Sequence, residues 1–134
     1  MNKYGLTAVR AVELLRAGLS EPESAWKQAA KQMFPESESS RAKACPKTTF
    51  LGLCSAGLIE GVPRASEISG DDGLNANYAR DAVELLRSEP NWAMEKAGDV
   101  WKEVMRRLGN APTKRANGQM DVVLALWAAG MILR

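Results

Sequence analysis

The hexapeptide Ala-Val-Glu-Leu-Leu-Arg occurs at residues 11–16 and again, letter for letter, at residues 82–87, which is 71 positions later. A second match lies further along each half. Leu-Gly-Leu-Cys-Ser-Ala-Gly-Leu-Ile at residues 51–59 is echoed by Leu-Ala-Leu-Trp-Ala-Ala-Gly-Met-Ile at residues 124–132. One such match between two helices of similar composition can arise by chance, whereas two in the same order predict an internal duplication.

A Trp-Lys pair lies between these matches in both halves, at residues 26–27 and 101–102. The offsets between matching stretches differ by a few residues, as changes in loop length produce. We place repeat one at about residues 1–62, the connection at about 63–74 and repeat two at about 75–134. Together they predict a single domain with pseudo-twofold symmetry.

Each repeat is predicted to form three helices, so the fold class is an all-α domain of six helices. Apolar residues at helical spacing, such as Ala8, Val12 and Leu15, give the first helix one apolar face, and no stretch alternates as a strand does. Residues 35–44 are polar and serine-rich, which predicts a loop. The expected helices are 3–17, 22 to just before Pro35, Pro46 to 56, 75–87, 90–108 with a break near Gly98, and 118–129.

Glycine and aromatic residues predict how these helices end and pack. Gly57 and Gly130 follow the last helix of each repeat, where a glycine in the left-handed region ends a helix. The large side chains expected in the shared core are Trp26, Phe50, Trp101 and Trp127, because aromatic residues bury the most area.

The composition and charge of the chain exclude several functional classes of protein. The 134 residues carry 18 basic and 16 acidic side chains, a net charge of +2, which is far from the charge of a dedicated nucleic-acid binder. The longest apolar run, residues 122–133, is too short to span a bilayer, and the N-terminal stretch does not resemble a secretory signal. Cys45 and Cys54, nine positions apart on one helix, are too distant for a disulfide. We therefore expect a soluble, cytoplasmic protein that does not bind membranes.

The sequence has no histidine. This excludes Ser-His-Asp and Cys-His catalytic sites and zinc sites that use histidine. Neither a Walker loop nor a Gly-x-Gly-x-x-Gly fingerprint is present. We predict no cofactor and no metal site, and the sequence favours a protein that is not an enzyme.

The repeat suggests one binding site. Ser40-Arg41 aligns with Thr113-Lys114, and each pair lies just before the last helix of its repeat, where free N–H groups attract anions. The predicted phosphate- or carboxylate-binding residues are Ser40, Arg41, Lys43, Lys47, Thr113, Lys114 and Arg115. Helix capping alone also accounts for a hydroxyl residue at these positions.

Cys45 is the second candidate. It stands near the start of a predicted helix between Lys43 and Lys47, a setting that favours a reactive thiolate. The alternative is that Cys45 only occupies a position at the helix end. Cys54 lies on the apolar helix and is expected in the core, and Asp71-Asp72 is expected to form a solvated turn.

Three functional classes remain. The first is a helical interaction or scaffold module for a protein partner or a small anion, with Trp92, which repeat one lacks, as the best candidate for an exposed aromatic. The second is a DNA-binding protein. Against this interpretation, about ten polar residues separate the second and third predicted helices, whereas a helix-turn-helix joins its helices by a turn of about 3–4 residues. The third is an enzyme that uses carboxylates or Cys45.

Several stretches resemble a small bacterial family that is known only as a domain of unknown function. They include Cys45-Pro46-Lys47, residues 50–54, Gly57-Leu58-Ile59 and residues 119–127. The resemblance covers nearly the whole chain and implies a bacterial origin and a stand-alone domain. It implies no activity, cofactor or partner, but it draws attention to the polar residues Cys45, Lys47, Gln119 and Asp121.

Overall fold

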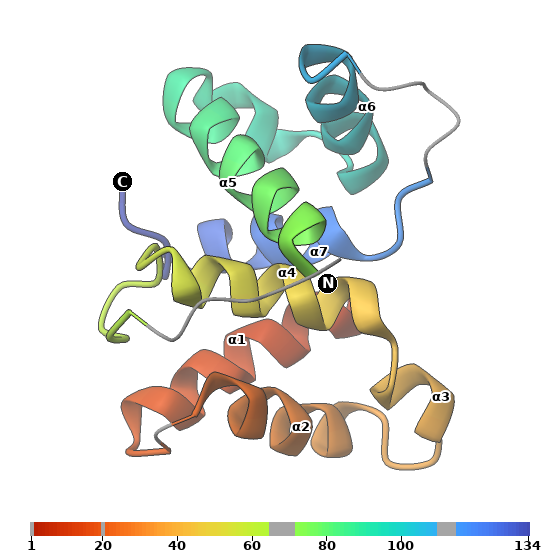
Figure 1. Cartoon of the computed structure of the whole chain (residues 1–134), viewed down its shortest axis with the longest axis vertical. Coiled ribbons are helices and arrows are strands. Elements are labelled where there is room, and N and C mark those ends of the chain that lie inside the picture. Colours follow the sequence, from red (N-terminus) through yellow and green to blue (C-terminus); the bar gives the residue numbers. More distant parts are fainter. Residues whose placement is uncertain (1, 20, 65–71, 110–114) are drawn as a thin grey trace.

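The computed structural model describes residues 2–19, 21–64, 72–109 and 115–134, and this part of the chain is all-helical (Figure 1). The predicted fold class is confirmed. Six helices have ten residues or more, and a one-turn helix and a 3₁₀ helix accompany them. The elements are α1 (Lys3–Arg16), α2 (Pro22–Met33), α3 (Glu38–Arg41), α4 (Ala44–Ser55), α5 (Asp72–Ser88), η1 (Pro90–Met94), α6 (Ala97–Arg107) and α7 (Gln119–Ala128).

One local prediction is wrong, one predicted break is confirmed, and one helix starts slightly earlier than predicted. The predicted loop at 35–44 contains α3, because the Ser37 side chain accepts a hydrogen bond from the Ser40 backbone N–H and starts a helical turn. The predicted break near Gly98 is present, because the stretch 90–108 divides into η1, which ends at Met94, and α6, which begins at Ala97. In the predicted connection, α5 begins at Asp72.

Helices from the two halves of the chain pack against each other. α1 contacts α2 and α7, while α4 contacts α5, α2 and α7, so that α4 and α7 lie at the centre of the molecule (Figure 1). One continuous core receives side chains from both halves. The predicted aromatic residues Trp26, Phe50, Trp101 and Trp127 are all buried in it.

The segments that follow α4 and α7 are joined by two backbone hydrogen bonds. The Glu60 N–H donates to the Met131 carbonyl at 2.8 Å, and the Leu133 N–H donates to the Leu58 carbonyl at 2.9 Å. Both donors and both acceptors stand 73 residues apart. The contact is an isolated antiparallel bridge between Ile59 and Ile132.

Matching features surround this bridge. Gly57 and Gly130 both have a φ of 71° and end their helices as predicted. The Arg16 guanidinium donates to the Glu60 carbonyl, and the Arg87 guanidinium donates to the Leu133 carbonyl. Each arginine therefore fixes the extended segment of its own half.

Gly52 lets α4 and α5 approach closely. A Cβ placed on Gly52 would lie 2.5 Å from the Ala76 Cα, well inside van der Waals contact. The crossing therefore requires glycine at this position of α4. The consequence for function is that the start of α5 lies against the second and third turns of α4, where Asn75 reaches Thr48.

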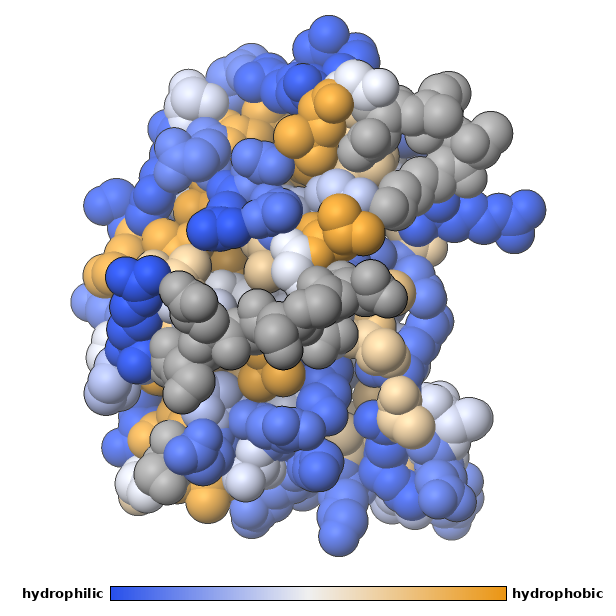
Figure 2. Space-filling model, viewed as in Figure 1, coloured by the Kyte–Doolittle hydropathy of each residue, from blue (hydrophilic) through white to orange (hydrophobic). Residues whose placement is uncertain are grey.

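The remaining surface features are modest. Trp92, the best candidate for an exposed aromatic, is partly buried against the core but is the least buried of the four tryptophans, and Met94 beside it is 87% exposed. Figure 2 shows apolar side chains scattered among polar ones on the face it presents. None of the described helices is long and apolar enough to cross a membrane.

We predict that Gly52→Ala lowers the free energy of unfolding by about 1–3 kcal/mol, because the added methyl group forces α4 and α5 apart. Gly98→Ala is the matched control, since a Cβ on Gly98 meets nothing within 4 Å. Alanine favours a helix, so this control should be neutral or stabilise by up to about 1 kcal/mol. Urea denaturation measures both, and equal effects of the two substitutions would contradict the close crossing.

Candidate functional site

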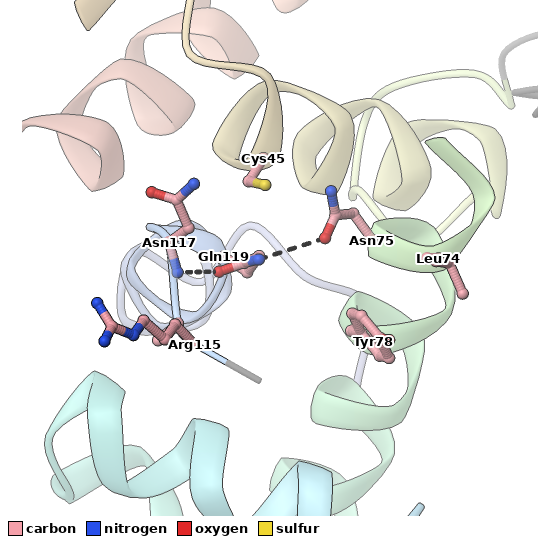
Figure 3. Close-up of a pocket in the computed structure, with 8 residues that line it drawn as sticks. Cys45, Leu74, Asn75, Tyr78, Arg115, Asn117 and Gln119 are labelled. Carbon is pink, nitrogen blue, oxygen red and sulfur yellow. Dashed lines mark hydrogen bonds between the residues drawn. The ribbon is translucent and has the colours of Figure 1, made fainter. Parts of the chain in front are cut away.

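The main candidate site is a cavity of about 510 Å³. It is bounded by the first turns of α4, α5 and α7 and by the segment that leads into α7 (Figure 3). Its volume lies in the usual range of small-molecule pockets. The lining residues are Cys45, Leu74, Asn75, Tyr78, Arg115, Ala116, Asn117 and Gln119.

A chain of hydrogen bonds, here called the amide relay, runs through the wall of this cavity. The Asn117 backbone N–H donates to Gln119 Oε1. Gln119 Nε2 donates to Asn75 Oδ1 at 3.3 Å, and Asn75 Nδ2 donates to Thr48 Oγ1 at 2.8 Å. The relay links α7, α5 and α4 and holds both amide side chains in place at the cavity.

Gln119 is the most buried polar member of the relay, with 3% of its surface exposed. It is the first residue of α7. In Figure 3 its amide lies between Asn117 and Asn75, while Leu74 and Tyr78 project from α5 on the other side of the cavity. The Tyr78 ring is fixed edge-on against Trp101, with centroids 5.4 Å apart.

The amino ends of α4 and α7 lie next to each other at this site. Gly118, the N-cap of α7, has a φ of +85°, and a Cβ there would lie 3.4 Å from the Pro46 Cβ. Neither Gly118 nor Lys43, the N-cap of α4, makes a side-chain capping bond. Both helices therefore begin without the side-chain oxygen that usually satisfies their first N–H groups.

The two thiols differ in environment. Cys45 is half-buried and lines the cavity as the second residue of α4. Cys54 is buried in the core, where loss of hydration raises the pKa of its thiol to about 12. Of the two, only Cys45 is placed to react with a solute.

Three of the predicted anion-binding residues have other roles. Arg41 donates to the Phe34 carbonyl at 2.7 Å and so caps the carboxyl end of α2. The hydroxyl of Ser40 is hydrogen-bonded to that of Ser37, and the Lys47 Nζ is 2.8 Å from Glu23 Oε1. None of these three lines the cavity.

The other four predicted anion-binding residues have different outcomes. The Lys43 ammonium lies over the Tyr4 ring, 5.4 Å from its centroid. Thr113 and Lys114 lie outside the described residues. Arg115 does line the cavity; it is exposed, and in Figure 3 its guanidinium is directed away from Gln119, at the rim. The structure therefore brings Cys45 and Arg115 together.

Sequence reasoning missed Asn75 and Asn117. Asn75 lies on a different helix and joins the site only through the crossing of α4 and α5. A comparison of the two halves contains a signal for it. At the offset of 71, Asn75 corresponds to Tyr4, so that an amide stands where repeat one has an aromatic ring.

Acidic residues do not line this cavity. Asp121, in the first turn of α7, is not among the lining residues; burial raises the pKa of its carboxyl, and the charge of Lys43 opposes that shift. No group of three or more Cys, Asp or Glu side chains that could hold a metal occurs within the described ranges.

A second, smaller hollow of about 310 Å³ lies between α5 and α6. Its basic residue, Arg107, is paired with Glu103, Nε to Oε2 at 2.6 Å. Hydrogen bonds from Arg106 and Arg107 lower the pKa of Glu103 to about 2. This hollow therefore offers fewer uncommitted polar groups than the first.

A family model supplies the one informative comparison with known proteins. The model of a family of unknown function (DUF6979) matches residues 1–133, and the chain belongs to that family. The resemblance to a domain of unknown function is thus confirmed. No curated protein and no solved structure matches the chain, so the functional argument depends on the site.

We predict that iodoacetamide modifies Cys45 in the folded protein at pH 8 and leaves Cys54 unmodified, because Cys54 is buried and its thiol stays protonated. Intact-mass spectrometry should show one added group on the native chain and two after unfolding in urea. Cys45→Ser should abolish the native modification, and Cys54→Ser should leave it unchanged. Rapid native labelling of Cys54 would contradict this assignment.

Proposed function

We propose that this member of the family is a small helical binding module that holds a small molecule in the cavity formed by the first turns of α4, α5 and α7. The observation that carries the proposal is the amide relay, which fixes a buried glutamine and a half-buried asparagine in the cavity wall. Ligand pockets typically combine apolar walls with a few fixed polar groups. Leu74 and Tyr78 provide such walls here.

We further propose that the chain is a tandem duplication with pseudo-twofold symmetry, as the repeated sequences predict. Two hydrogen bonds support it, one from Glu60 to Met131 and one from Leu133 to Leu58. The two donors are 73 residues apart in the sequence, and so are the two acceptors. The equivalent contacts of Arg16 and Arg87 add further support.

The duplication bears on function because the two corresponding positions differ. In repeat one the position of Asn75 is taken by Tyr4, whose ring lies 3.6 Å from a Cβ placed on Gly118 and is covered by the Lys43 ammonium. An aromatic ring thus occupies the region that corresponds to the cavity. Repeat two has the shorter Asn75 there, and the region is open.

The other functional classes have less support. As a DNA reader, α4 would have to enter a groove, but seven of its twelve residues are buried, so it has little surface to offer. An enzyme with its active site in this cavity would depend on Cys45, since no acidic residue is among the lining residues. A scaffold that binds a protein partner would use exposed apolar residues, and those present are dispersed.

Location and origin are part of the proposal. We place the protein in the cytoplasm of a bacterium. The two free thiols, Cys45 and Cys54, suit a reducing compartment, and the family resemblance found in the sequence motifs supports a bacterial source.

We predict that Asn75→Tyr abolishes ligand binding in the cavity, because the ring fills the space as Tyr4 does in repeat one. The measurement is an NMR screen of a fragment library with ¹⁵N-labelled protein. Fragments that bind should shift the backbone amides of Cys45, Asn75 and Gln119 in the wild type.

Asn77→Tyr is the matched control, since Asn77 is exposed on the opposite face of α5 and should leave binding unchanged. Leu74→Trp, at a half-exposed lining position, fills the cavity without breaking the relay and tests the same idea if Asn75→Tyr is unstable. A library that shifts none of the cavity amides would refute the proposed function.

A further inference from the structure

We propose that the ligand of the cavity is a small carboxylate, which accepts hydrogen bonds from the amide N–H groups of Gln119 and Asn75. This inference depends on the proposed function and adds the chemical class of the ligand. It rests on the direction of the amide relay, on the burial of Gln119 and on the electrostatics of three helix ends.

The direction of the relay is fixed at both of its ends by backbone groups. At one end the Asn117 backbone N–H can only donate, so the oxygen of Gln119 must face it. At the other end the Thr48 hydroxyl gives its hydrogen to the Ala44 carbonyl at 3.0 Å, and so it accepts from Asn75. The orientation of both side-chain amides follows from these two constraints.

With this direction, the relay uses only some of the hydrogen-bond donors of its two side-chain amides. Gln119 Oε1 and Asn75 Oδ1 each accept a hydrogen bond within the relay. Each amide nitrogen carries two hydrogens and donates only one of them in the relay. Among the described residues no acceptor takes the second hydrogen of Gln119 Nε2 or of Asn75 Nδ2.

The remaining donor on Gln119 is costly to leave unpaired. Gln119 is 3% exposed, and its Nε2 keeps one hydrogen bond, to Asn75 Oδ1, so that only the second N–H loses its hydration without a partner. A ligand oxygen in the cavity would satisfy it. A carboxylate suits this position because it carries two acceptor oxygens and no donor.

The surrounding field favours a negative charge. The cavity touches the first turns of three helices, and a helix carries partial positive charge at its amino end. Asp121, in the first turn of α7 but outside the lining, offsets part of that charge. At α4 and α7 no side chain caps that end. Arg115 is the charged residue among the lining residues, and none of them is acidic.

Three probes of nearly equal shape separate charge from fit: sodium benzoate, benzamide and benzamidinium. Each is titrated into ¹⁵N-labelled full-length protein, and the backbone amide shifts of Cys45, Asn75 and Gln119 are followed. We expect benzoate to bind at least tenfold more tightly than benzamidinium, with benzamide between them. Unlabelled benzoate should also shift the side-chain NH₂ signals of Gln119 and Asn75.

Substitutions then test the relay itself. Gln119→Glu replaces the donor by a charged acceptor of the same shape and should weaken benzoate binding at least tenfold. Gln28→Glu makes the same change at an exposed position of α2 and should have no effect. If Gln119→Glu does not fold, Arg115→Gln at the exposed rim should still weaken benzoate binding severalfold, and more than it weakens benzamide binding.

The outcomes separate this inference from the proposed function. If benzamidinium shifts the cavity amides at concentrations equal to or lower than benzoate, or if Gln119→Glu binds benzoate undiminished, the carboxylate assignment is overturned while the cavity remains a binding site. If none of the three probes and no library fragment shifts these amides, both the proposed binding function and the carboxylate assignment are refuted.

Discussion

The pairing of α4 with α7 is the constraint on which the rest of the structure depends. At their carboxyl ends the chain continues into two short segments that exchange hydrogen bonds between Glu60 and Met131 and between Leu133 and Leu58. At their amino ends Gly118 approaches Pro46. The two helices therefore run side by side in the same direction (Figure 1). Each then carries a helix of the other half, because α1 packs on α7 and α5 packs on α4, and neither half can bury its core alone.

This arrangement has an electrostatic consequence at one end of the molecule. Parallel neighbouring helices place two positive ends together, whereas antiparallel neighbours would pair opposite ends. Here α5 adds a third amino end, because Gly52 allows it to begin close to α4. The first turns of the three helices enclose the cavity. The fold thus brings the amino ends of α4 and α7, which no side chain caps, to one place beside the first turns of α5.

The sequence was sufficient for the fold class but not for the site, and particular residues show why. Helical spacing, Gly57, Gly130 and the core aromatics depend on local pattern or on burial, and they were predicted correctly. Arg41 was assigned to an anion site because it precedes a helix, yet its guanidinium satisfies the last carbonyls of α2. The local sequence shows that a cationic side chain is present, but it does not show which carbonyl or carboxylate group that side chain binds. Asn75 reaches Thr48 and Gln119 across 27 and 44 residues of chain, so the crossing of the helices is needed to show what it contacts.

The proposed duplication helps to separate structure from function within the chain. Where both halves keep the same residue, as with Arg16 and Arg87, the structure gives both copies the same mechanical role. At other corresponding positions the two halves carry different residues. There, one half can show a filled alternative to an open arrangement in the other half. Tyr4 is that filled alternative to Asn75, and it would remove both the cavity and the donor beside it. A half-buried asparagine that leaves a hollow costs packing contacts, because a void has no partner atoms on one side. The hydrogen bonds of Asn75 to Thr48 and Gln119 hold the open arrangement in place, and a ligand bound beside them would restore the missing packing contacts.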